Sequence, residues 1–285
     1  MRTEQEMMDL ILSVAKQNEN VRGVAMNGSR VNPNAPKDRY QDYDIVYLVR
    51  EIEPMLKDRS WIDVFGERAV MQTPDEGHLF PGRREHGFAF LMQFTDGTRI
   101  DLTLYDIQYK EEYLKEDKLT VVLLDKDGSL PTLPAPTDED YRVQKPSQEV
   151  YADCCNEFFW TAPYVAKGLC RDEFLYAAFH MEQCTRAMLL LMLRWKAGIR
   201  TDFSVTVGKC EKYLPRYLDP EEWNRLRACY RYDSVDGIWE ALDRAIRLFR
   251  ETALFVGERL GYPYDWEQDE KTVALIQNMK NWEQE

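Results

Sequence analysis

The pattern of apolar residues changes once along this chain, at the proline-rich segment 130–137. Before that segment, short runs of β-branched and aromatic residues are separated by turn residues, which is typical of strands. After it, apolar residues recur every three or four positions over long stretches, which is typical of helices. One such change in a chain of 285 residues predicts two domains, which we place at 1–135 and 136–285.

The first domain is expected to be a mixed β-sheet flanked by helices. Residues 3–18 have helical spacing of apolar side chains, and a short helix is expected at 61–65. Asp96-Gly97 stands between two β-rich runs and predicts a hairpin there. Strands are expected at 21–26, 43–49, 68–72, 88–94, 99–105 and 121–124.

The second domain is expected to be an all-α helical bundle, so that the fold class of the whole chain is α+β. Long helices are predicted over 147–168, 172–197 and 234–260. Another helix is predicted to begin after Asp219, because Asp is a favoured N-cap and the following Pro220 suits the first turn.

Composition limits the partners of the chain. It has 37 Lys and Arg against 50 Asp and Glu, a formal net charge of −13, which argues against nucleic-acid binding and fits a cationic ligand. No apolar run approaches the roughly 20 residues of a membrane span, and the N-terminus does not resemble a secretory signal. The six cysteines form no C-x-x-C pair, so we expect reduced thiols in a cytoplasmic protein. We expect the chain to be a monomer or weak dimer.

Three carboxylates carry the most chemical information. Asp42 and Asp44 stand two residues apart at the start of a predicted strand, so both point to the same face. Their mutual repulsion is tolerable when a divalent cation lies between them, and hard oxygen ligands suit Mg²⁺. Asp101 lies on a later strand, on the face shared by Arg99 and Thr103. If the two strands are neighbours, the three acids converge, either as metal ligands or with one acid as general base. The alternative for Asp101 is an exposed strand acid paired with Arg99 or a lysine.

A turn that could bind phosphate precedes these acids. The predicted strand 21–26 ends in Asn27-Gly28-Ser29-Arg30, where glycine allows backbone amides to approach an anion. The serine hydroxyl adds a donor and Arg30 adds charge. Gly-Ser alone is weak evidence, and the alternative is a simple turn.

The order of these motifs is more specific than any one of them. A strand, Gly-Ser, a spacer, Asp-x-Asp and a later lone Asp resemble the nucleotidyltransferase superfamily with the polymerase-β-like fold. The segment 203–214 (FSVTVGKCEKYL) and the two-part layout narrow this to the aminoglycoside 6-adenylyltransferases that inactivate streptomycin. The resemblance covers essentially the whole chain.

The resemblance implies Mg²⁺-dependent transfer of AMP from ATP, the co-substrate, to the 6-hydroxyl of streptomycin. Asp42 and Asp44 would bind Mg²⁺ and the triphosphate, and Asp101 would act as base or complete the metal shell. The other implied nucleotide contacts are Gly28, Ser29, Arg30, Lys209 and Tyr213. Gly208-Lys209 does not have the spacing of a Walker A loop, so only the resemblance supports a phosphate contact there.

A cationic acceptor needs acidic and aromatic side chains, and the helical half offers candidates. Glu182 lies within an apolar helix, where a carboxylate should face a ligand or a partner; the partner available one turn later is Arg186. Asp153, Glu157 and Trp160 could bind or stack on a guanidinium group. Their alternative is a solvated helix face.

Two other functions stay open. The same enzyme class could act on a different acceptor, such as another aminoglycoside, a lincosamide or a protein side chain. Alternatively, the fold could serve as a non-catalytic nucleotide-binding module or toxin–antitoxin partner. Such modules often lack the third acid, whereas Asp101 is present here.

Overall fold

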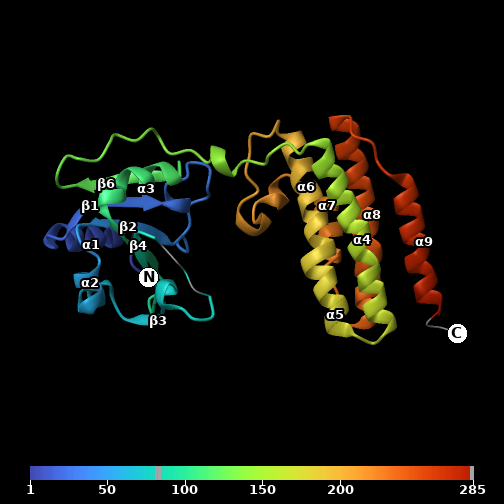
Figure 1. The fold of residues 1–285 in the computed structure, drawn as a ribbon, viewed down its shortest axis with the longest axis horizontal. Coiled ribbons are helices and arrows are strands. Elements are labelled where there is room, and N and C mark those ends of the chain that lie inside the picture. Colours follow the sequence, from blue (N-terminus) through green and yellow to red (C-terminus); the bar gives the residue numbers. More distant parts are fainter. Residues whose placement is uncertain (81, 83–84, 283–285) are drawn as a thin grey trace. The chain divides into compact units, whose positions relative to one another are not determined.

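The computed structural model describes residues 1–80, 82 and 85–282. Two compact units follow one another along the chain, Met1–Asp140 and Tyr141–Glu285 (Figure 1). The division falls just after the proline-rich segment 130–137.

The first unit is built on a mixed sheet with the strand order β3-β4-β5-β2-β1-β6. Strands β2 and β5 pair in parallel, and the other neighbours in this order pair antiparallel. The predicted mixed sheet is therefore confirmed, including the hairpin of β4 and β5. The strands are β1 (Val21–Asn27), β2 (Tyr43–Val49), β3 (Arg68–Gln72), β4 (Gly87–Phe94), β5 (Arg99–Asp106) and β6 (Thr120–Asp125).

Helices cover both faces of this sheet (Figure 1). One face packs on α1 (Glu4–Gln17) and α2 (Glu53–Lys57) and buries alternate residues of β2 such as Ile45 and Tyr47. The other face packs on α3 (Lys110–Glu116), whose Tyr113 and Leu114 bury Val46 and Leu48. The helix expected at 61–65 is a 3-10 helix, Ser60–Phe65, whereas α2 and α3 were not predicted.

The second unit is all-α, as expected. Its longest helices, α4 and α8, stack Phe158 on Phe249 with the ring centroids 3.8 Å apart. The helix predicted over 172–197 is interrupted by a π-helical segment, His180–Thr185, and the last helix was not predicted. The helices are α4 (Gln148–Cys170), α5 (Phe174–Phe179), α6 (Arg186–Arg200), α7 (Pro220–Ala228), α8 (Val235–Leu260) and α9 (Trp266–Trp282).

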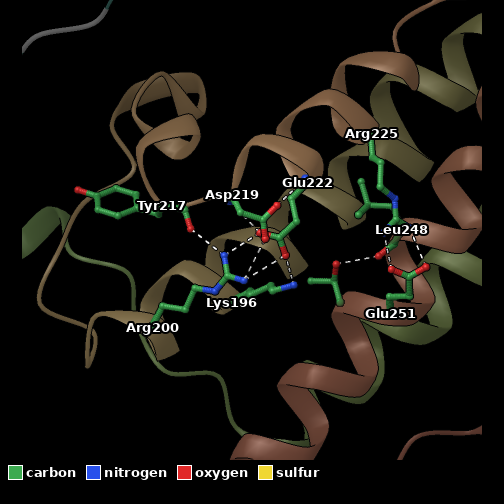
Figure 2. Close-up of polar contacts among 9 residues, drawn as sticks. Lys196, Arg200, Tyr217, Asp219, Glu222, Arg225, Leu248 and Glu251 are labelled. Carbon is green, nitrogen blue, oxygen red and sulfur yellow. Dashed lines mark hydrogen bonds and ion pairs between the residues drawn. The ribbon is translucent and has the colours of Figure 1, made fainter.

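A nearly buried charge network joins α6 to α7. Asp219 is the N-cap of α7, as predicted, and forms a capping box with Glu222. Figure 2 shows Lys196 and Arg200 of α6 pointing toward the same Glu222 carboxylate. The Glu222 and Lys196 side chains are only 10% and 11% exposed, so each charge needs the other to offset the cost of its burial.

Across the residues that the structure describes, no helix is long and apolar enough to cross a membrane.

Candidate active site

The register of three adjacent strands decides where the acids lie. Strands β2 and β5 run parallel with Asp44 directly opposite Asp101. On the other side of β2, Asn27 of β1 lies opposite Asp44, so the Gly28 turn begins beside the same carboxylate. These side chains therefore share one end of one sheet face.

The carboxylates at this end repel one another. The pKa of Asp44 is raised to about 6, chiefly by burial and further by the nearby charges of Asp101 and Asp42. Carboxylate oxygens are the ligands that Mg²⁺ prefers, and a divalent cation would relieve this repulsion. The chemistry of the donor set therefore fits a magnesium ion.

Arg99 contacts two of these acids in the structure. Its Nε and Nη2 donate to the two carboxylate oxygens of Asp101, each at 2.8 Å, and its Nη1 lies 3.6 Å from Asp42 Oδ2. This is the ion pair that the sequence offered as the alternative for Asp101. Among the described residues, no three His, Cys, Asp or Glu side chains are arranged to hold a metal ion.

Gly28 fits closely against Asp44. Its φ is +76°, a conformation that favours glycine, and a Cβ atom at this position would lie 2.2 Å from Asp44 Oδ2. Its amide donates to the carbonyl of Leu119 at 3.2 Å. The glycine therefore allows the close approach of the turn to the carboxylate, while its own amide is used within the fold.

Arg30 is engaged by protein groups. Its Nε donates to the carbonyl of Asp42 at 3.0 Å, and its Nη2 donates to that of Gln41 at 2.8 Å. The guanidinium lies 3.7 Å from the ring centroid of Tyr43, and the side chain is 7% exposed. Ser29 contributes its carbonyl to the same loop, where it accepts from Gln41 Nε2 at 3.2 Å. Arg30 thus positions the loop that carries Asp42.

Lys209 and Tyr213 lie in one tight turn of the second unit. Lys209 is exposed and begins a 3-10 turn after Gly208, whose φ is +72°. The Tyr213 amide donates to the carbonyl of Val207 at 2.8 Å. Cys210 and Glu211 also have positive φ values of 55° and 56°. Residues other than glycine rarely adopt this conformation, and it often marks functional sites. The residue types at positions 210 and 211 did not indicate it in the sequence.

Asp153, Glu157 and Trp160 share the exposed face of α4, as their spacing of four and three residues requires. Trp160 is 62% exposed, and its ring meets that of Tyr164 edge-on at 6.1 Å between centroids. These side chains are accessible to a ligand from solvent.

Glu182 lies in the π-helical segment and pairs with Arg186, the partner that the four-residue spacing offered. The Arg186 side chain is fully buried, and its Nη2 donates to the carbonyl of Cys229 at 2.6 Å. Tyr232 donates its hydroxyl to Glu182, and Tyr230 stacks on the Arg186 guanidinium at 3.9 Å. Glu182 is therefore the counter-ion of a buried arginine, whose burial the sequence did not reveal.

A mixed sheet that gathers carboxylates beside a glycine turn, followed by a helical unit, defines the class of nucleotidyltransferases. The family model described as "Streptomycin adenylyltransferase" matches residues 1–279. The chain therefore belongs to this family and is an adenylyltransferase, as its motifs predicted.

Curated relatives agree over nearly the whole chain. The "Aminoglycoside 6-adenylyltransferase" of Campylobacter jejuni is 42% identical over 282 residues, which cover 99% of this chain and 98% of that protein. The protein of the same name from Bacillus subtilis (strain 168) is 39% identical and covers 93% of each chain. A solved structure, "Crystal structure of an aminoglycoside 6-adenyltransferase from Bacillus subtilis", is 34% identical over 98% of this chain and 99% of that one, with a TM-score of 0.49.

Proposed function

We propose that this adenylyltransferase transfers AMP from ATP to an aminoglycoside, and that the acceptor is the 6-hydroxyl of streptomycin, so that the antibiotic is inactivated. The relatives named aminoglycoside 6-adenylyltransferase support the transfer and the acceptor class. The observation that carries the proposal is the position of Asp44 opposite Asp101, directly against the Gly28 turn.

In the proposed reaction, Asp101 takes the proton of the acceptor hydroxyl. The acceptor oxygen forms a bond to the α-phosphorus of ATP, and the bond from that phosphorus to the pyrophosphate oxygen breaks. Asp42, Asp44 and Asp101 are the residues that would hold Mg²⁺, which would neutralise negative charge on the phosphates. Arg30 keeps Asp42 in place through its loop.

The proposed acceptor contacts follow from exposure and charge. Asp153 and Glu157 are exposed and can accept hydrogen bonds from guanidinium groups, and Trp160 can stack on such a group. Glu182 already neutralises Arg186, which reduces the charge that it can offer to a ligand. Lys209 and Tyr213 are proposed contacts of the triphosphate on the resemblance of their segment to the family, and Lys209 is exposed at the start of its turn.

A mass assay with a panel of acceptors tests the substrate. The protein is incubated with ATP, Mg²⁺ and, separately, streptomycin, other aminoglycosides and a lincosamide. We expect streptomycin to gain the mass of one AMP on the 6-hydroxyl, and we expect EDTA to abolish the product. A product on another aminoglycoside or on a lincosamide, with streptomycin unmodified, would contradict the proposed acceptor. ATP binding without any product would favour the non-catalytic module.

Exchange of Asp101 for Asn tests its role as base. The Asn side chain cannot take a proton, so we expect the turnover number to fall on the order of 10²- to 10⁴-fold while ATP·Mg²⁺ still binds. Equilibrium binding of a non-hydrolysable ATP analogue and steady-state turnover give the two quantities. An equal loss of nucleotide affinity would show that Asp101 acts only as a metal ligand and not as the base.

A further inference from the structure

Arg99 donates hydrogen bonds to both carboxylate oxygens of Asp101. It begins β5, two residues before Asp101, so both side chains point to the same face of the strand. Its two parallel hydrogen bonds of 2.8 Å to Asp101 form the bidentate arrangement that fixes a carboxylate in one plane. The third nitrogen of the same guanidinium faces Asp42 at 3.6 Å.

This pairing sets Asp101 apart from the other acids. An oxygen that accepts a hydrogen bond from a guanidinium is less available to a metal ion, because the two cations repel and compete for the same lone pairs. Within the described part of the chain, no group of three acidic, His or Cys side chains is arranged as a metal site, although Asp44 and Asp101 stand opposite each other.

We propose that Arg99 is a positioning residue that holds the Asp101 carboxylate while no metal ion is bound and competes with divalent cations for it. This inference rests on the proposed function, since it takes the three acids to be the magnesium ligands. Binding of the metal ion would break the two hydrogen bonds to Asp101 and release the guanidinium.

The exposure of the pair makes such a release feasible. The side chains of Arg99 and Asp101 are 39% and 21% exposed, so Arg99 can turn into solvent without unpacking the core. Ion pairs with this degree of solvent contact are weak, because water and salt screen them. A divalent cation also balances more of the negative charge of Asp42, Asp44 and Asp101 than one arginine does.

Titration with Mn²⁺ in the absence of nucleotide tests the competition without measuring activity. Free Mn²⁺ is followed by electron paramagnetic resonance in the wild type, Arg99→Gln and Arg99→Lys. We expect Arg99→Gln to bind Mn²⁺ on the order of tenfold more tightly, because the competing charge is gone. Arg99→Lys keeps the charge but loses the bidentate geometry, so its dissociation constant should lie between the other two.

The matched control is Arg59→Gln, which also removes a bidentate pair in the same unit. Arg59 pairs with Glu76 and lies over Phe90, on the opposite sheet face from the acids. The Mn²⁺ affinity of Arg59→Gln should equal that of the wild type. Thermal unfolding provides a second readout. In EDTA we expect Arg99→Gln to unfold at a lower temperature than the wild type, and we expect added Mg²⁺ to raise its unfolding temperature by more than that of the wild type.

The outcomes separate the two proposals. Equal or weaker Mn²⁺ binding by Arg99→Gln than by the wild type would overturn the competition. If Arg99→Gln does not fold, Arg99→Lys decides. A Mn²⁺ affinity of Arg99→Lys equal to that of the wild type would contradict the competition, and tighter binding would support it. Absence of Mn²⁺ binding in all variants would instead contradict the magnesium assignment, and the competition with it.

Discussion

The contact between Gly28 and Asp44 is the tightest constraint at the scale of single residues. The turn after β1 needs a positive φ, and the Asp44 carboxylate fills the space where any other side chain would begin. Gly28 is therefore required for two separate reasons, its backbone conformation and the space above it. The sequence predicted a turn at Gly28 that allows close approach of the backbone, but neither the positive φ nor the contact with Asp44, which depends on strand register.

Exchange of Gly28 for Ala tests that double requirement. Gly128 is the matched control, because its φ is also positive, +62°, but no described atom would lie within 4 Å of a Cβ added there. We expect Gly128→Ala to lose about 1 kcal/mol of unfolding free energy and to keep full turnover. Gly28→Ala should lose more and should also lose AMP transfer, because Asp44 must move. Urea unfolding and a turnover assay measure both; equal behaviour of the two variants would refute this account.

The pair of Glu182 and Arg186 supports a prediction about stability. Removal of the Glu182 carboxylate takes the counter-ion away from a fully buried arginine. Because Glu182 is itself 37% exposed, we expect Glu182→Gln to lose about 1–3 kcal/mol of unfolding free energy rather than the full cost of a buried pair. Glu258→Gln, on the exposed surface of α8, is the control and should be near neutral. Unchanged urea unfolding of Glu182→Gln would exclude the structural role.

At the scale of elements, the sequence predicted the strands and long helices well because their periodicity is strong. The two short helices α2 and α3 were missed, since five and seven residues give too few turns to show a period. Helix α9 was missed because its apolar residues do not form a clear stripe. The π-helical segment His180–Thr185 has no sequence signature at all, since it keeps helical spacing on both sides.

The attachment of α7 to α6 predicts a dependence on pH. Burial alone would raise the pKa of Glu222, but hydrogen bonds from Lys196 and Arg200 outweigh it and lower the pKa to about 2. Because this pKa is lower in the folded than in the unfolded state, the stabilisation is fully present above the ordinary value of 4.5. It is lost as the pH falls from there toward 2.

Glu222→Gln should therefore lose about 3 kcal/mol of unfolding free energy at pH 7, because Lys196 stays buried without its counter-ion. The difference from the wild type should shrink as the pH falls below about 4.5. Glu221→Gln changes an exposed neighbour in the same helical turn and is the control. Urea unfolding between pH 3 and 7 measures the difference; a gap between the wild type and Glu222→Gln that is independent of pH would contradict the assignment.

At the scale of the whole molecule, the sequence indicated the division into a sheet unit and a helical unit, and motif order indicated the family. The convergence of Asp44 and Asp101 was predicted only as a condition, because nothing local in the sequence fixes which strands are neighbours. The engagement of Arg30 and the burial of Arg186 could not be predicted, since both depend on contacts with residues that only the fold brings close.

The most direct measurement of the central claim is the rate of AMP transfer from labelled ATP to streptomycin by two variants of the sheet unit. Asp44→Asn changes the acid that faces Asp101, whereas Asp106→Asn changes an acid at the far end of strand β5. We predict that Asp44→Asn loses transfer by at least about 10²-fold and that Asp106→Asn retains it. Full transfer by Asp44→Asn would contradict the claim that these carboxylates act together at one end of the sheet.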